Sequence, residues 1–380
     1  MKRTAKTKSH ACKATHRPAE HTLAEIYSQP HIWRETEKHL KASRMLDRLA
    51  GTFSPGSPWL FVGCGSSYYL SRLIAALWTK HFYIPATGVP ASEILFAPEE
   101  TLRRIGAEQI VLMSRSGETT EVLRVAELLQ SHKALQTLAV TCHPQSILEK
   151  LCTHIFKLDW ADEESTVMTR SFTAILLAFQ RLGLKFVGDD QLSSALDQLP
   201  KKGQKWFNTH AAEIQDFGRK RKFSDYIFLG QGVHYWLAQE AALKVTEMSS
   251  SYAQVYHSLE FRHGPRSIAG PETLITFYIS DAAAEAETTL LCELKDLGAA
   301  TCVIVNRATP EIKNHSDLLI ELALDGPEFA RYAVSAIPAH LLGTEVGLQK
   351  GLNPDAPKNL TRAVVLPSAP GRRRAKRRRA

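Results

Sequence analysis

Two polar, glycine-containing turns each follow a short apolar run of the sequence. The first is GCGSSYY at residues 63–69, and the second is SRSGETT at residues 114–120. If each turn opens a helix, backbone N–H groups together with Ser and Thr hydroxyls can line a site for an anion. The alternative is that Ser116 or Thr119 only caps the helix that follows.

The chemistry of these turns favours a phosphate monoester as the anion. The first turn contains Gly63 and Gly65 but lacks the third glycine of a dinucleotide-binding fingerprint, and the sequence contains no G-x-x-x-x-G-K-[ST] motif. Arg115 contributes a permanent charge with a planar fork that suits phosphate. The turns therefore predict a phosphate site rather than a site for NAD or ATP.

A second set of reactive side chains lies in AQEAALKVTEMSS. Glu240, Lys244 and Glu247 are four and three residues apart, so a helix would place them on one face. A carboxylate held beside a sugar can move a proton between neighbouring carbons if its pKa is raised. A surface ladder of ion pairs is the alternative. His263, in the loop RHGP, could move a further proton or could simply be solvated.

The elements that must position these residues alternate along the chain. Short apolar runs precede segments of helical period, the pattern of βαβ units on a parallel sheet. In the first half we expect strands at 59–63, 109–114, 137–141 and 154–159, and helices at 66–82, 119–132 and 146–152. Ligands of such sheets bind beyond the carboxyl ends of the strands, where both polar turns fall.

The same arrangement returns in the second half. FVGCGSSYYL, from Phe61, aligns with FLGQGVHYWL, from Phe228, and IVLMS ending at Ser114 aligns with TFYIS ending at Ser280. A repeat of this length is too long for a solenoid. We therefore expect an α/β protein with two tandem, internally duplicated, doubly wound parallel-sheet domains of the flavodoxin-like kind.

Charge and length suggest how the 380 residues divide. Six basic residues within 1–17 and seven within 371–380 outweigh an acidic body and produce the net charge of +8. We expect both ends to be solvated, disordered tails, with any binding of nucleic acid confined to them and sensitive to salt. The expected divisions are a basic tail at 1–20, a helical leader at 21–45, a first domain at 46–198, a second domain at 205–367 and a basic tail at 368–380.

Other classes of protein are disfavoured by what the sequence lacks. Six cysteines occur without a C-x-x-C pair or the spacing of metal ligands, so we expect reduced thiols and no metal site. No apolar stretch approaches the length of a membrane span, and the basic N-terminus lacks the apolar region of a signal peptide. A cytoplasmic protein with no membrane contact and no cofactor is the expectation.

Several motifs, in their order, together resemble the tandem sugar isomerase (SIS) domain family. They are GCGSSYY, SRSGET, ESTVMTRSFT, ALKVTEMS and SLEFRHGP. The pattern is similar to the isomerase half of glucosamine-6-phosphate synthase and, more closely, to tagatose-6-phosphate ketose/aldose isomerases and galactosamine-6-phosphate deaminases. The resemblance covers about residues 22–367.

The resemblance implies roles for particular residues. It implies Glu247 as the base for proton transfer, with Lys244 and His263 as further catalytic residues and His263 supplied by the neighbouring subunit of a homodimer. It implies contacts from Thr169 and Ser171 to the sugar hydroxyls. The residues that it implies for phosphate binding are Gly65, Ser66, Ser67, Ser114, Arg115, Ser116 and Thr119.

The expected reaction depends on two differences between this sequence and the synthase. Arg362 stands where the synthase has a lysine that forms a Schiff base, and an arginine cannot act as that nucleophile, so we expect a direct enediol or enolamine route. No glutamine amidotransferase domain with its catalytic cysteine precedes the motifs, so we expect free ammonia. The expected activity is isomerisation of a hexosamine 6-phosphate with loss of ammonia. The alternatives are a ketose/aldose 6-phosphate isomerase without deamination and a non-catalytic sugar-phosphate sensor.

Overall fold

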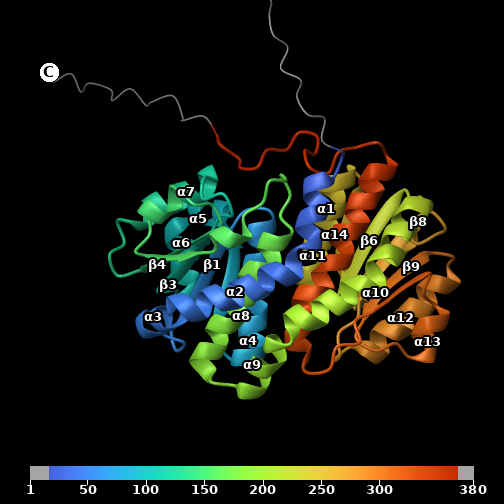
Figure 1. Cartoon of the computed structure of the whole chain (residues 1–380), viewed down its shortest axis with the longest axis horizontal. Helices are drawn as coiled ribbons and strands as arrows, with labels where there is room; N and C mark the ends of the chain where they lie inside the picture. The colour runs from blue at the N-terminus through green and yellow to red at the C-terminus, as the bar shows by residue number, and fades with distance from the viewer. Residues whose placement is uncertain (1–16, 367–380) are drawn as a thin grey trace, which may run out of the picture.

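Two parallel sheets form the framework of the protein (Figure 1). The computed structural model describes residues 17–366, so most of both predicted tails lies outside the described residues. The first sheet has the order β2-β1-β3-β4-β5. Its strands are β1 (Trp59–Gly63), β2 (Ala86–Pro90), β3 (Gln109–Met113), β4 (Gln136–Thr141) and β5 (His154–Lys157).

The second sheet repeats the first. Its order is β10-β9-β8-β6-β7, which is the same doubly wound order when it is read from the β7 edge. Its strands are β6 (Asp225–Gly230), β7 (Tyr252–His257), β8 (Thr273–Tyr278), β9 (Ala300–Val305) and β10 (Leu318–Glu321). The predicted fold class and the predicted duplication are therefore confirmed, and the strand order is that of flavodoxin-like sheets.

Helices cover both faces of each sheet. In the first half they are α1 (Glu20–Tyr27), α2 (Gln29–Ser43), α3 (Met45–Thr52), α4 (Ser66–Phe82), α5 (Ala91–Phe96), α6 (Pro98–Ile105), α7 (Thr120–Leu129), η1 (Leu148–Lys150), η2 (Asp159–Ala161), α8 (Arg170–Val187) and α9 (Asp190–Asp197). In the second half they are α10 (Leu199–Lys220), α11 (Val233–Ser249), η3 (Leu259–Arg262), η4 (Pro265–Ile268), α12 (Ala284–Asp296), α13 (Pro310–Asn314), η5 (Glu328–Arg331) and α14 (Tyr332–Gln349).

Two expectations about elements need correction. The predicted helix at 146–152 is only the single 3-10 turn η1, because the segment has just seven residues and Ile147 remains exposed, too little to stabilise an isolated helix. Strand β2 was not predicted, since ATGVP carries little β propensity. It pairs with β1 at the sheet edge.

A shared core joins the two halves. The largest hydrophobic cluster includes Trp78 of α4, Phe179 of α8, Leu237 of α11 and Ile337 of α14, and each sheet has a separate cluster on its outer face. Figure 1 shows α11 and α14 between the two sheets. Residues 199–204, which separate the two expected domains, lie in the first turns of α10, so the chain continues there as a helix.

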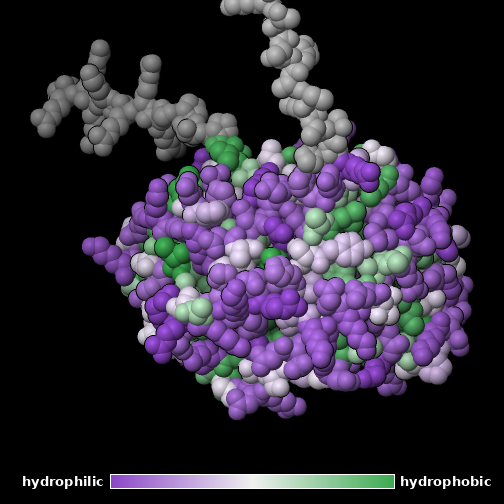
Figure 2. All heavy atoms as spheres, in the orientation of Figure 1, coloured by the Kyte–Doolittle hydropathy of each residue, from purple (hydrophilic) through white to green (hydrophobic). Residues whose placement is uncertain are grey.

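The surface seen in Figure 2 is mostly hydrophilic, and its hydrophobic residues lie in small separate groups. Within residues 17–366, no helix is both long enough and apolar enough to span a bilayer.

Candidate active site

A cavity of about 170 Å³ lies beyond the carboxyl ends of β1 and β3. These strands are parallel neighbours, so the turns that follow them emerge at the same edge of the sheet, at the point where the strand order reverses. Residues from both halves of the chain line the cavity: Cys64, Gly65, Ser66, Ser67, Arg115, Ser116, Thr119, Thr166, Met168, Glu247, Leu360, Thr361, Arg362, Ala363 and Val364.

The hydroxyl groups after β3 form a compact group, which we call the hydroxyl cradle (Ser114, Ser116 and Thr119). Ser114 Oγ lies 3.1 Å from Thr119 Oγ1 and 3.4 Å from Ser116 Oγ. Thr119 occupies the N-cap position of α7, yet its side chain makes no capping hydrogen bond. The alternative that Thr119 only caps the helix is therefore not supported by its contacts.

Glycine is required where the second turn bends. Gly117 has a φ of +67°, in the left-handed region, and a Cβ there would lie 1.8 Å from Ser146 Oγ. A glycine at this position therefore lets the loop that contains Ser146 approach the turn closely.

Three charged side chains of α11 lie behind the cavity. Lys244 Nζ is 2.5 Å from Glu247 Oε2 and 3.3 Å from Glu240 Oε1, and Lys244 is fully buried. Burial alone would lower the pKa of Lys244, but the two carboxylates outweigh it and raise that pKa. Burial raises the pKa of Glu240 to about 7, even though Lys244 opposes the shift.

Glu247 is the member of this trio that lines the cavity. Its side chain retains 20% exposure, against 2% or less for Glu240 and Lys244. The alternative of a surface ladder is excluded for Glu240 and Lys244 by their burial. A protonated lysine that orients a partly accessible carboxylate is an arrangement that can place a base against a bound sugar.

The contacts of Arg115 differ from those expected of a phosphate ligand. One guanidinium nitrogen, Nη1, donates to Glu163 Oε2 at 3.2 Å and to the carbonyl of Val167 at 3.1 Å. The other, Nη2, donates to the carbonyls of Thr166 at 2.9 Å and Arg362 at 3.2 Å. Arg115 lines the cavity, but these contacts make it a clamp between two loops. Phosphate binding by Arg115 stays a prediction.

The predicted sugar contacts of Thr169 and Ser171 are not supported by their surroundings. Both residues are fully buried, and both hydroxyls donate to the carboxylate of Glu163, with Thr169 Oγ1 at 2.8 Å. Thr166, from the same loop, lines the cavity instead. A second buried carboxylate, Glu25 of α1, accepts the backbone N–H of Glu164 at 2.5 Å.

The C-terminal segment Leu360–Val364 forms one wall of the cavity. The Thr120 N–H, at the start of α7, donates to the carbonyl of Val364 at 3.0 Å. Arg362 forms an ion pair with Asp162. Its place in the wall agrees with the expectation that this segment belongs to the site, although no local pattern of residues indicated the path of the chain.

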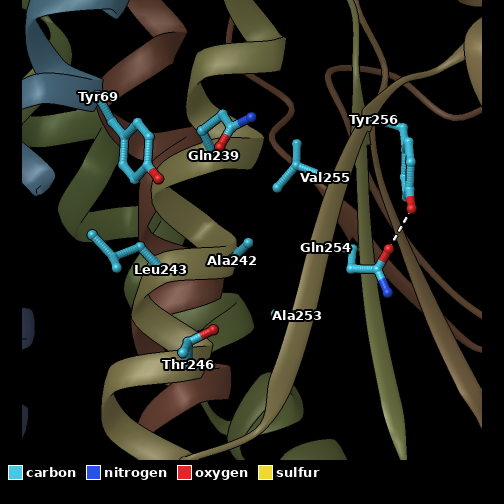
Figure 3. A pocket seen from close by; sticks show the side chains of 9 residues that line it. All are labelled: Tyr69, Gln239, Ala242, Leu243, Thr246, Ala253, Gln254, Val255 and Tyr256. Carbon is cyan, nitrogen blue, oxygen red and sulfur yellow. Dashed lines mark hydrogen bonds between the residues drawn. The ribbon is translucent and has the colours of Figure 1, made fainter. Parts of the chain in front are cut away.

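His263 lies between η3 and η4, after the edge strand β7, and it is not among the described residues that line the cavity. A separate hollow of about 380 Å³ lies beside β7, between that strand and α11. Figure 3 shows Tyr69 and Gln239 on one side of this hollow and the β7 side chains on the other. Within residues 17–366, no group of three or more His, Cys, Asp and Glu side chains could hold a metal ion.

Comparison with known proteins adds a family relationship to this geometry. The SIS domain model matches residues 59–185 and 222–345. The glutamine–fructose-6-phosphate aminotransferase (isomerizing) of Chlamydia muridarum is 27% identical over 360 residues, which cover 90% of this chain and 58% of that protein. The chain thus spans about three fifths of the length of such curated relatives.

Two solved structures have the same architecture over their whole length. Glucosamine-6-phosphate deaminase from Thermotoga maritima is 27% identical, with a TM-score of 0.74 over 91% of this chain and 100% of that one. Tagatose-6-phosphate ketose/aldose isomerase from Escherichia coli is 20% identical, with a TM-score of 0.78 over 94% of this chain and 100% of that one. At that identity, the second likeness concerns the fold alone.

Proposed function

We propose, from the premise that the chain belongs to the SIS domain family, that it is a sugar-phosphate isomerase that converts a hexosamine 6-phosphate to a ketose 6-phosphate and releases ammonia. One observation carries the proposal: Ser116 and Thr119 of the hydroxyl cradle line the same cavity as Glu247 of the second half, with Ser114 directly behind them. An anion-binding turn facing a carboxylate suits a substrate with a phosphate at one end and an acidic C–H at the other.

In this proposal, some of the side chains bind the phosphate and others carry out the proton transfer. The hydroxyl cradle, with Ser67 and the N–H groups at the start of α4, would hold the phosphate. Glu247 would remove the proton from C2 of the open-chain amino aldehyde and deliver it to C1. Lys244 would orient that carboxylate and balance its charge, as their 2.5 Å contact supports.

Ammonia leaves after the proton transfer. Moving the C2 proton to C1, together with a proton from the amine nitrogen to O1, converts the amino aldehyde to an imine at C2 beside a C1 hydroxyl group. One molecule of water then hydrolyses the imine to the ketone and ammonia. No oxidant or reductant enters this sequence. Arg362 lies in the cavity wall, and an arginine side chain does not act as an amine nucleophile, so the route we propose forms no Schiff base at that position.

The test is to measure release of ammonia and formation of ketose phosphate from glucosamine 6-phosphate and galactosamine 6-phosphate. Glu247→Gln, which keeps the shape and removes the base, is the matched variant. Ammonia from the wild type but not from the variant supports the proposal. Conversion of fructose or tagatose 6-phosphate without ammonia would mean a simple isomerase. Tight binding of sugar phosphates with no turnover would mean a sensor.

We also propose that the enzyme is a homodimer in which His263 acts at the cavity of the other copy. The observation that supports this is that His263 does not line the cavity of its own chain although the family resemblance implies a catalytic role for it. An imidazole can move the proton that opens a pyranose ring. Each copy would then supply the hydroxyl cradle and Glu247 of one site and the histidine of the other.

A further inference from the structure

The second half contains a crevice at the position that corresponds to the hydroxyl cradle. Gly232, after β6, has a φ of +59°, close to the +55° of Gly65 after β1. His234 follows Ser67 by 167 residues, and Asp281 follows Arg115 by 166, close to the spacings of the duplication. Here the cavity is only about 10 Å³, room for no more than one water molecule. The crevice is closed by the protein's own side chains.

His234 lines this crevice and belongs to a group of five side chains from both halves that contact one another, which we call the Glu328 cluster. Its members are Lys80 and His81 of α4, His234 of α11, Glu328 of η5 and Tyr332 of α14. Glu328 accepts hydrogen bonds from Lys80 Nζ and, at 3.0 Å, from the Tyr332 hydroxyl. Its other oxygen accepts the Asp281 N–H at 2.9 Å. A carboxylate of the second half thus binds a lysine of the first.

The histidines complete the cluster as neutral groups. His81 Nε2 lies 2.9 Å from the Tyr332 hydroxyl, which donates its own proton to Glu328, so His81 must be the donor to that hydroxyl. Burial lowers the pKa of both His81 and His234 to about 4. Burial alone would raise the pKa of Glu328. His234, which is protonated at so low a pH, together with Lys80 and a backbone N–H holds that pKa at about 2.

The duplicated helices connect this cluster to the proposed active site. Lys80 and Glu247 are separated by the same 167 residues as Phe61 and Phe228, so they are equivalent positions of α4 and α11. Helix α4 begins at the cavity with Ser66 and reaches the cluster at Lys80, about 20 Å along its axis. Helix α11 begins at the cluster and reaches the cavity at Glu247. Each helix therefore has one end in the cluster and the other in the cavity.

We infer that the Glu328 cluster is a positioning device that fixes α4 against the second half and so holds Glu247 at its working distance from the hydroxyl cradle. The cradle belongs to the first half and Glu247 to the second. A loosened cluster misplaces the base while leaving the phosphate ligands in position, and small misplacements of a catalytic group are costly. The inference rests on the proposed function for its kinetic readout.

Kinetics separate this role from general destabilisation. Lys80→Met and Glu328→Gln should each lower kcat by about tenfold while KM for the sugar phosphate changes by less than about twofold. The double variant should be no worse than either single one, because both remove the same contact. Lys80→Arg, which keeps the charge, should recover most of kcat. Lys295→Met, which breaks an ion pair inside the second half, is the matched control and should behave as the wild type.

Calorimetry without substrate provides a readout that does not depend on the proposed function. The wild type should unfold in one transition, and Lys80→Met should separate or broaden it as the halves uncouple. If Lys80→Met broadens the transition but the wild type is inactive on every sugar phosphate, the proposed function is overturned. The cluster would still be shown to couple the two halves. Unchanged calorimetry with unchanged kcat would overturn the inference. A rise in KM that matches the fall in kcat would also overturn it.

Discussion

At the scale of the residue, the site consists of common side chains whose roles depend on their partners. Ser116 and Thr119 line the cavity, as their sequence context predicts, because the turn itself points them there. Arg115 also lines the cavity, but its guanidinium contacts Glu163, a buried carboxylate on a loop of irregular path, and the Ser171 hydroxyl contacts the same carboxylate. Sequence patterns identify the residues of a turn, but they do not specify which distant acceptor an arginine or serine will meet.

Removing a single hydroxyl of the cradle should weaken substrate binding. Thr119→Val keeps the shape of the side chain but loses a donor to the phosphate, and hydrogen bonds to charged groups contribute about 1.5–3 kcal/mol. We expect KM for the sugar phosphate to rise about tenfold or more with kcat nearly unchanged, measured by steady-state kinetics. Thr288→Val, on α12 outside the site, is the control. An unchanged KM for Thr119→Val would contradict phosphate binding by this hydroxyl.

Glu240 should make stability depend on pH in a predictable direction. Burial raises the pKa of Glu240 to about 7 from an ordinary value of 4.5, so the folded protein holds the proton of this carboxyl more tightly than the unfolded chain does. The stability contributed by the bound proton is complete below pH 4.5 and is lost as the pH rises through 7. The amide of Glu240→Gln does not titrate. Relative to the wild type, the variant should therefore gain on the order of 3 kcal/mol of unfolding free energy between about pH 4.5 and pH 8.

Urea unfolding of both proteins at several pH values measures this difference. Gln cannot supply the negative charge that Glu240 presents to Lys244, so a constant offset between the two curves is expected at high pH. The informative quantity is how the difference in unfolding free energy between the variant and the wild type changes with pH. Parallel curves across this range would show that Glu240 remains ionised in the folded protein.

At the scale of the element, helices with long periodic patterns were predicted well and irregular segments were not. Helix α4 occupies the predicted residues 66–82, because a helix of this length buries a continuous apolar face. The segment 360–364 contributes a wall of the cavity although it has no periodic pattern. Its path is decided by single contacts, such as the one between Thr120 and Val364, which no local pattern encodes.

The clamp made by Arg115 joins two of these irregular segments and should matter more for stability than its position in the cavity suggests. Arg115→Ala leaves the carboxylate of Glu163 buried without its partner, a loss of about 3–5 kcal/mol in comparable buried pairs. Adding Glu163→Gln removes that uncompensated charge and should recover part of the loss. Denaturant unfolding of both single variants and the double variant gives the coupling energy. Additive losses would contradict the clamp.

At the scale of the whole molecule, the two halves contain equivalent ion pairs in which the acidic and basic partners have exchanged places. Arg115, after β3, binds Glu163 from the loop before α8, whereas Asp281, after β8, binds Arg331 at the start of α14. Both pairs hold the segment before a long helix, α8 in the first half and α14 in the second, against the turn after the third strand of that half. The duplication was visible in the sequence, but this exchange was not, because neither partner lies in the aligned motifs.

Mixing two inactive variants should restore activity if each cavity uses His263 of the other copy. Glu247→Gln and His263→Ala would each be inactive alone, while a mixed dimer pairs an intact Glu247 with an intact His263 in one of its two cavities. Random exchange predicts about a quarter of the wild-type activity. The measurement is turnover after the mixed variants are unfolded and refolded together. No recovery, with mixed dimers present, would contradict the shared site.

The cavity draws its walls from residues as far apart in the chain as Cys64 and Val364. During synthesis the first half can fold while the second is still being made, since domains emerge and fold from the N-terminus onward. At that stage the hydroxyl cradle exists without its base and without its C-terminal wall. Under the proposed function, a ribosome-bound chain would bind a sugar phosphate well before it could turn one over, and catalysis would begin only once almost the whole chain had been synthesised.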